Sequence, residues 1–314
     1  MAVLRFSIAC LCLICLGGVL FILPGTAAMA DPIVIEHERG TVTLDQPAKR
    51  VAVTNWAFAE TLIALGLDPV AIADPADYRD WVAKPELPDD FIDLGQRGSP
   101  NMEALRKAKP DLILISQELE MAYENLSTVA PVMMLSVYDD GNVAFDAATG
   151  MLRKVARAIG REDAGAAYLR KVDAQLGEYG NRVRDILGPD GALTVASFYS
   201  EANIAVFGAP SLYGSVLVRM NVPLAYQGDV SKWGFARGGL EILAPLAKST
   251  LVYTNPIPDV IHEKAWSSPI WKIMDFVRNN RVYELPVVWA YGGVPSGLRF
   301  AKLLTESLES GPVR

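Results

Sequence analysis

Cysteine is almost absent from this chain of 314 residues. The three cysteines, Cys10, Cys12 and Cys15, all lie within the first thirty residues, in a segment that we expect to be removed. The remaining chain would contain no thiol, which excludes disulfide bonds, thiolate metal sites and cysteine catalysis. Its stability must come from a hydrophobic core, and a chain of this length can build a large one.

Histidine is equally scarce, since only His37 and His262 are present. They form no i,i+4 metal pair, and the sequence contains neither a G-x-S-x-G turn nor a glycine loop that would cradle phosphate. We therefore expect both histidines at the surface or as caps, and we predict no metal site and no enzyme. An exported hydrolase that uses carboxylates is the alternative from a different class.

Basic charge and long apolar runs are also limited. The formal net charge is −7 with a pI near 5.0, and the absence of a basic run argues against nucleic acid as a partner. The single long apolar run, residues 6–23, follows Arg5 and precedes Ala28-x-Ala30, which predicts a signal peptide over residues 1–30. An uncleaved anchor is the alternative. No later run could span a bilayer, so we expect a soluble product outside the cytoplasm.

The rest of the sequence is typical of an α/β fold. Short apolar runs such as "RVAVT", "DLILIS" and "TLVYTN" alternate with helical patterns, and this alternation indicates α/β units. Long amphipathic patterns interrupt the alternation and predict one continuous helix over roughly residues 144–162. We predict an N-terminal lobe (31–143), a connecting helix region (144–190) and a C-terminal lobe (191–314), called here the first lobe, the connecting region and the second lobe.

This organisation predicts two similar α/β lobes joined by a single long rigid helix. Ligands of such sheets bind outside the carboxyl ends of the strands, where loops of the two lobes would face one another. We therefore expect a ligand cleft between the lobes.

One loop of the first lobe, "DLGQRGSPNMEAL" (93–105), places Arg97 just before a helix. Ser99 is the expected N-cap and Pro100 the first helical residue. An arginine beside the positive end of a helix is well placed to meet an oxygen-rich ligand and poorly placed for stability. A solvated surface arginine is the alternative.

Several aromatic residues fall between elements rather than on a helical stripe. Tryptophan in loops near a cleft commonly supplies a rigid wall with one hydrogen-bond donor. Trp266 and Trp271 lie on a predicted helix (266–276) and are expected in the core. The candidates for the cleft wall are Trp81, Trp233, Trp289 and Tyr291.

The order and spacing of these segments resemble the periplasmic iron–siderophore binding proteins of ABC importers, and the ferric hydroxamate binders among them most. The segments that carry the resemblance are "ALGLDPVAIADPADYRDWV", "LPDDFIDLGQRGSPNMEAL", "QGDVSKWG" and "PVVWAYG". The resemblance implies a monomeric periplasmic receptor that delivers a ferric siderophore to an inner-membrane ABC permease. Iron would enter only as its siderophore complex, so no cofactor is expected.

By the same resemblance, Trp81 and Arg97 are ligand residues of the first lobe. Trp233, Trp289 and Tyr291 are their counterparts in the second lobe. A ferric tris-hydroxamate is nearly neutral, so one guanidinium and aromatic walls suit it, whereas a tris-catecholate calls for several cations.

Two positions depart from the family pattern. Leu119 stands where the family has a tyrosine, and Tyr123 is the candidate substitute; a ferric catecholate, a ferric carboxylate, haem or a cobalamin are therefore alternative ligands. The family also carries an outward glutamate on each lobe that docks onto the permease. Glu60 matches the first and is the expected docking residue, while Ser215 stands at the second.

Overall fold

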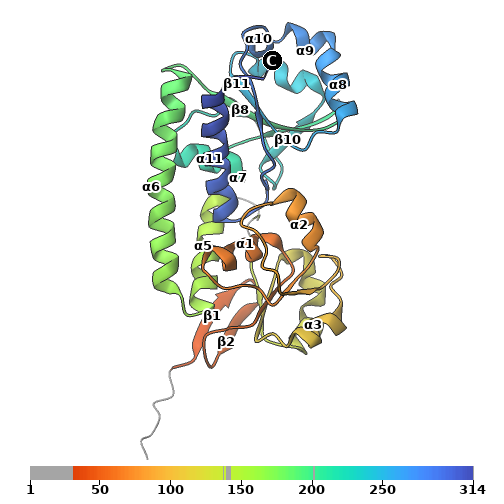
Figure 1. Cartoon of the computed structure of the whole chain (residues 1–314), viewed down its shortest axis with the longest axis vertical. Helices are drawn as coiled ribbons and strands as arrows, with labels where there is room; N and C mark the ends of the chain where they lie inside the picture. Colours follow the sequence, from red (N-terminus) through yellow and green to blue (C-terminus); the bar gives the residue numbers. More distant parts are fainter. Residues whose placement is uncertain (1–30, 137, 139–142, 201, 314) are drawn as a thin grey trace, which may run out of the picture. The chain divides into compact units, whose positions relative to one another are not determined.

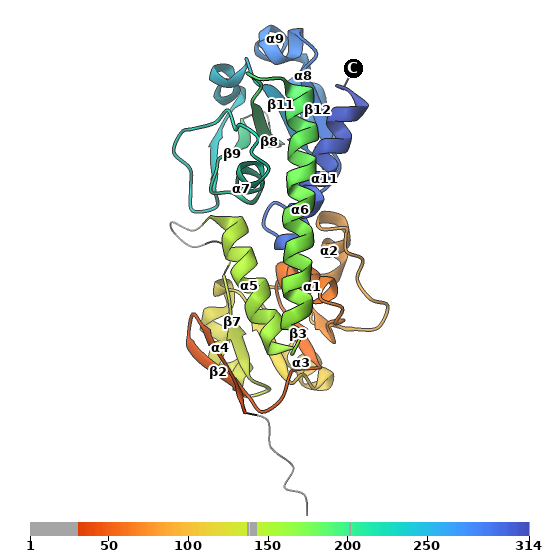
Figure 2. The same cartoon turned by 90° about the vertical axis from the view of Figure 1, so that its left-hand side faces the viewer.

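The computed structural model describes residues 31–136, 138, 143–200 and 202–313. The expected signal peptide, residues 1–30, lies outside the described residues. From Pro32 onward the chain forms one compact unit, in which two five-stranded sheets lie beside one long helix (Figures 1 and 2). The predicted two-lobed α/β class is confirmed.

The first lobe is built on a parallel sheet of short buried strands. These are β3 (Val51–Val53), β4 (Ala71–Ile72), β5 (Ile92–Asp93), β6 (Leu112–Ile115) and β7 (Val132–Met134). Their order is β5-β4-β3-β6-β7, and every neighbouring pair is parallel. All residues of β3 and β6 are buried, as expected for apolar strands covered on both faces.

Short helices connect these strands, and a hairpin precedes them. The helices are α1 (Trp56–Ala64), α2 (Pro75–Trp81), α3 (Met102–Ala108), the 3-10 helix η1 (Gln117–Ala122) and α4 (Tyr123–Ser127). The hairpin consists of β1 (Ile33–His37) and β2 (Gly40–Leu44), which pair antiparallel.

The N-cap of α3 differs from the prediction. Asn101, rather than Ser99, is the cap: its side-chain oxygen accepts the backbone N–H groups of Glu103 (2.9 Å) and Ala104 (3.1 Å). Both residues are favourable caps in general. Asn101 takes the position because its own backbone N–H also donates to Leu94 O at 2.7 Å, which fixes where the helix begins.

The second lobe repeats the strand order but not all strand directions. Its strands are β8 (Leu193–Ser200), β9 (Asn203–Phe207), β10 (Phe235–Gly238), β11 (Thr250–Thr254) and β12 (Val282–Leu285). The order is β10-β9-β8-β11-β12, with β8, β11 and β12 parallel and the pairs β8–β9 and β9–β10 antiparallel. The lobes are therefore similar without being copies.

The helices of the second lobe are α7 (Leu212–Arg219), the 3-10 helix η2 (Leu240–Leu246), α8 (Asp259–Ser267), α9 (Pro269–Ile273), α10 (Asp275–Arg278) and α11 (Val294–Ser310). Three short helices, α8 to α10, thus replace the single helix predicted over 266–276. Trp271 is buried in the core as predicted, whereas Trp266 is half-buried and packs against it, with ring centroids 4.3 Å apart.

The long helix is not the one that the sequence predicted. Helix α5 (Ala144–Ala158) ends before residue 162, because Gly160 takes a left-handed φ of +66° where a Cβ would lie 2.8 Å from Pro47. A new helix, α6 (Glu162–Leu187), then runs for 26 residues and packs against α5, α7 and α11. Figure 2 shows α6 alongside both lobes.

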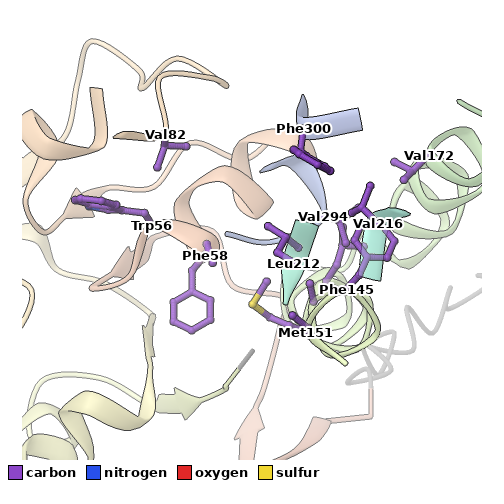
Figure 3. Close-up of a cluster of buried hydrophobic side chains, with 14 of the residues drawn as sticks. Trp56, Phe58, Val82, Phe145, Met151, Val172, Leu212, Val216, Val294 and Phe300 are labelled. Atoms are coloured by element: carbon purple, nitrogen blue, oxygen red, sulfur yellow. The ribbon is translucent and has the colours of Figure 1, made fainter. Parts of the chain in front are cut away.

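One continuous core joins the lobes. The same cluster of buried side chains contains Phe58 of α1, Phe145 of α5 and Phe300 of α11. Figure 3 shows Phe145, Val216 and Val294 meeting in this core. None of the helices in the described part of the chain combines the length and hydropathy needed to cross a bilayer.

Candidate ligand-binding site

A cavity of about 670 Å³ opens between the lobes, within the size range of small-molecule sites. The first lobe lines it with the start of α1, the Arg97 loop, η1 and the segment after β7. The second lobe lines it with residues 232–237 and with the loop that carries Trp289 and Tyr291. The predicted cleft is therefore present, and loops that follow strands supply much of its wall.

Aromatic rings form one side of the cavity. The Tyr291 ring lies 5.5 Å from Trp233 and 5.2 Å from Trp289, both edge-to-face. Tyr138 joins them, with ring centroids 5.5 Å from Trp233 and 5.7 Å from Tyr291. Burial raises the pKa of Tyr291 well above its ordinary value, so its hydroxyl remains a neutral donor. The sequence interpretation missed Tyr138, although it also lies between two elements.

Arg97 lies in the cavity wall in a partly buried position. Its guanidinium carbon is 3.8 Å from the centre of the Trp56 ring and 5.9 Å from that of Trp289. Its Nε donates to Asp74 Oδ2 at 3.3 Å, and its backbone N–H donates to the same oxygen at 3.0 Å. The electrostatic cost of a cation beside the positive end of α3 is thus offset by the Asp74 carboxylate and the buried Trp56 ring. The sequence analysis predicted neither partner.

Trp81 lies outside the cavity wall. Its side chain is partly exposed, and its ring meets Trp289 edge-to-face at 6.1 Å. The structure therefore brings four predicted ligand residues, Arg97, Trp233, Trp289 and Tyr291, to the cavity, whereas Trp81 contacts Trp289 without lining the cavity.

Charged side chains of both signs line the rest of the cavity. Lys232 and Arg237 stand on the second lobe, and Glu118 and Glu120 of η1 on the first. Glu120 is paired with Arg39 at 3.2 Å, whereas Glu118 accepts only from Ser116 Oγ at 3.5 Å among the described groups.

The candidate substitute for the missing family tyrosine does not reach the cavity. Tyr123 donates from its hydroxyl to Val132 O at 3.4 Å and stacks on His37 at 5.9 Å. Leu119 is buried in the first-lobe core. Their neighbours on η1, Gln117, Glu118 and Glu120, face the cavity instead.

The histidines do not gather into a metal site. His37 is buried rather than at the surface, and its Nδ1 accepts the backbone N–H of Arg39 at 3.2 Å, as expected of a capping side chain. His262 stacks on Trp266 at 4.2 Å. Across the described ranges, no three His, Cys, Asp or Glu side chains form a group that could hold a metal ion.

The prediction that Glu60 is an exposed docking residue is wrong. Glu60 is completely buried, and its carboxylate accepts hydrogen bonds from the Gly293 N–H and from Ser296 Oγ (2.7 Å). Ser215 is buried as well, and its hydroxyl donates to Ser211 O at 2.6 Å. At both positions another helix covers the side chain: α1 packs against α11 at Glu60, and α7 packs against α5 at Ser215, whose Oγ also accepts the Phe145 N–H at 3.2 Å.

Two α/β lobes on a long helix, with an aromatic cavity between them, define a class of binding proteins that enclose a small ligand between lobes. Residues 51–288 match the model of the periplasmic binding protein family, so the chain belongs to that family. Its known relatives are binding proteins, and the prediction that the chain is not an enzyme is confirmed.

Individual relatives cover nearly the whole chain. The iron(3+)-hydroxamate-binding protein FhuD of Escherichia coli (strain K12) is 27% identical over 90% of this chain and 94% of its own length. The Fe(3+)-citrate-binding protein YfmC of Bacillus subtilis (strain 168) is 25% identical over 83% of this chain and 80% of its own. The structure of the Fe3+–Desferal-bound siderophore binding protein FhuD from Vibrio cholerae superposes with a TM-score of 0.79 at 27% identity, over 84% of this chain and 99% of that one.

Proposed function

We propose that this chain is a periplasmic receptor that captures a ferric siderophore, with a ferric tris-hydroxamate as the preferred ligand class. It would then hand the chelate to an inner-membrane ABC permease and act as a monomer. Iron would enter as the complete chelate, with no protein side chain as a metal ligand. The observation that carries the proposal is the cavity between the lobes, where Arg97 faces a wall of aromatic rings.

The chemistry of Arg97 suits hydroxamate oxygens. Its Nε is engaged by Asp74, while its two Nη atoms have no hydrogen-bond partner among the described residues. A planar guanidinium held over Trp56 can donate in a fork to two neighbouring oxygens. Trp233, Trp289 and Tyr291 would cover the organic scaffold of the chelate.

The balance of charge supports a nearly neutral ligand. Arg97, Lys232 and Arg237 bring positive charge to the cavity, and Glu118 and Glu120 oppose it. A ferric tris-catecholate carries about three negative charges, and desolvating them beside two carboxylates would be costly.

A ferric carboxylate is the second candidate. Lys232 and Arg237 have no carboxylate partner among the described residues, so both could meet an anionic arm of a chelate. The similarity to the citrate-binding relative from Bacillus subtilis supports this candidate.

Titration of intrinsic fluorescence distinguishes the candidates. Because Trp233 and Trp289 line the cavity, ferric Desferal should quench the fluorescence saturably at micromolar concentration. Ferric citrate and a ferric tris-catecholate should bind at least about tenfold more weakly. The metal-free chelator is the control and should also bind weakly, because it is not preorganised. If ferric citrate binds more tightly than ferric Desferal, the carboxylate candidate replaces the hydroxamate; if no chelate binds, the receptor proposal is abandoned.

A further inference from the structure

The carboxylate of Glu60 connects the two lobes. Glu60 belongs to α1 of the first lobe, and its two oxygens accept from Gly293 N–H and Ser296 Oγ at the start of α11 in the second lobe. The side chain is completely buried. Helix α11 runs for 17 residues, and the free N–H groups and positive dipole end of such a helix favour a carboxylate there. Glu60 thus caps a helix of the other lobe.

Burial and the contacts of Glu60 act in opposite directions on its ionisation. Burial raises its pKa to about 7, while the hydrogen bonds from Ser296 and Gly293 and the charge of Arg299 hold it below the value that burial alone would give. A buried carboxylate is costly unless its oxygens are hydrogen-bonded. These donors therefore confine the carboxylate to one position.

The residues capped by Glu60 directly follow two side chains of the cavity wall. Trp289 and Tyr291 precede Gly292 and Gly293 in the chain. At Gly292 a Cβ would lie 2.6 Å from Glu60 Oε1, so the absence of a side chain allows this close approach.

Two further groups of the first lobe hold the same segment. The Tyr138 hydroxyl donates to Ala290 O at 2.7 Å. The Trp56 ring meets the Trp289 ring edge-to-face at 4.9 Å. A short segment of the second lobe, residues 289–293, is thus held by Glu60, Tyr138 and Trp56 of the first lobe, and Trp81 and Arg97 also lie against its Trp289.

We propose that Glu60 is a positioning residue that fixes segment 289–293 against the first lobe, so that Trp289 and Tyr291 stand in the cavity wall before a ligand arrives. A preformed wall loses less conformational entropy on binding. Glu60 does not touch the ligand and acts through the segment that it caps. The part of this proposal that concerns ligand affinity rests on the proposed function; the part that concerns the segment does not.

The first test needs no ligand. Hydrogen exchange of the backbone around residues 288–296 is measured in the wild type, Glu60→Leu and Glu60→Gln. Leucine is of similar size and accepts no hydrogen bond, so exchange there should rise by about tenfold or more. Glutamine keeps an acceptor for Gly293 and can donate to Ser296, so it should restore most of the protection.

The matched control for this test is Leu105→Ala. Leu105 is buried in the separate first-lobe cluster, so its loss should destabilise the lobe without raising exchange specifically at 288–296. If Glu60→Leu does not fold, Ser296→Ala removes one of the two donors and should raise exchange at the same segment. Unchanged exchange at 288–296 in the folded variant would overturn the proposal.

The second test measures affinity for ferric Desferal well below the unfolding temperature. Glu60→Leu should weaken binding by about tenfold, Glu60→Gln by much less, and Leu105→Ala not at all. If Glu60→Leu binds as tightly as the wild type, the positioning role is rejected. If the wild type itself binds no ferric chelate, the proposed function fails, and hydrogen exchange alone decides the role of Glu60.

Discussion

Arg97 meets three groups that no local pattern in its own loop reveals. Its guanidinium lies over Trp56, its Nε contacts Asp74, and Trp289 of the second lobe is 5.9 Å away. Since the side chain is held in one place before a ligand binds, little rotamer entropy remains to be lost on binding. If Arg97 contacts the chelate as proposed, Asp74 and Trp56 contribute to ligand affinity as well as to stability.

Arg97→Ala should weaken binding of ferric Desferal by roughly ten- to a hundredfold, because a charged donor to a ligand contributes about 1.5–3 kcal/mol. Stability should fall by only about 1 kcal/mol, since the ion pair with Asp74 is partly exposed. Isothermal titration and thermal unfolding measure the two effects. Arg79→Ala is the control, because Arg79 lies against Phe91 and does not line the cavity. An unchanged affinity in Arg97→Ala would show that Arg97 is a surface arginine that does not bind the ligand.

Glu60 should also make stability depend on pH. Its pKa is raised from 4.5 to about 7 in the folded protein, mainly by burial. A raised carboxyl pKa stabilises the folded state below pH 4.5, and this contribution is lost as the pH rises through about 7. The other groups that act electrostatically on Glu60 do not titrate in this window, because burial raises the pKa values of Tyr78, Tyr138 and Tyr168, and Arg299 stays charged.

The measurement is the free energy of unfolding of wild type and Glu60→Gln at pH 5 and pH 8. The wild type should lose on the order of 2–3 kcal/mol relative to Glu60→Gln over this range. Titration of His37 and of surface groups is common to both proteins and cancels in the comparison. Parallel pH profiles for the two proteins would contradict a buried, titrating Glu60.

At the scale of elements, the start of α3 controls the loop that carries Arg97. Asn101 caps the helix through two backbone N–H groups, whereas Ser99 is exposed and its side chain caps nothing. Asn101→Ala should therefore lower the free energy of unfolding by about 1 kcal/mol. Ser99→Ala, two residues away, should leave it almost unchanged. Chemical denaturation of both variants makes the comparison, and a larger loss in Ser99→Ala would show that the helix begins where the sequence alone had placed it.

The sequence predicted one long helix in the connecting region, whereas the structure has two, α5 and α6. The left-handed Gly160 ends the turn after α5, and α6 then packs against α5, α7 and α11. Local periodicity predicts helical structure on both sides of this break. Which helix is long enough to run beside both lobes depends on a turn in which Pro47 leaves no room for a side chain at Gly160.

For the whole molecule, the shared core and α6 limit the movement of one lobe against the other. Bending α6 would break several of its backbone hydrogen bonds, and opening the lobes would expose the common cluster around Phe145. The cavity should therefore change little when a ligand binds, and release would depend on the permease.

Paired spin labels test this rigidity. Residues 31–314 contain no cysteine, so Arg106→Cys on α3 and Lys272→Cys on α9 introduce two exposed labels, one on each lobe. The distance between them should shift by less than about 2 Å on saturation with ferric Desferal. A wild-type-like titration of the labelled protein by fluorescence is the control. A much larger shift would mean that the lobes close as a hinge.

The sequence by itself determined the class of the fold and four of the side chains that line the cavity. Buried apolar runs such as "LILI" identify strands because only a doubly covered sheet tolerates them. Trp233, Trp289 and Tyr291 stood out because large rings between elements have no helical stripe to join. Both patterns can be recognised from neighbouring residues in the sequence, without any information on the other lobe.

Only the tertiary structure determined which groups each of these side chains contacts. The family resemblance placed Glu60 on the outer face of the first lobe, yet α11 covers it and supplies its donors. Trp81 and Tyr138 occupy similar places in the sequence, but only Tyr138 reaches the cavity. The periodicity of a sequence shows only whether a position differs from its neighbours on the same helix or strand. The burial of Glu60 and its hydrogen-bond donors depend on a helix more than 200 residues away in the chain. For this reason Arg97 and three aromatic residues of the cavity wall were predictable, and the carboxylate that joins the two lobes was not.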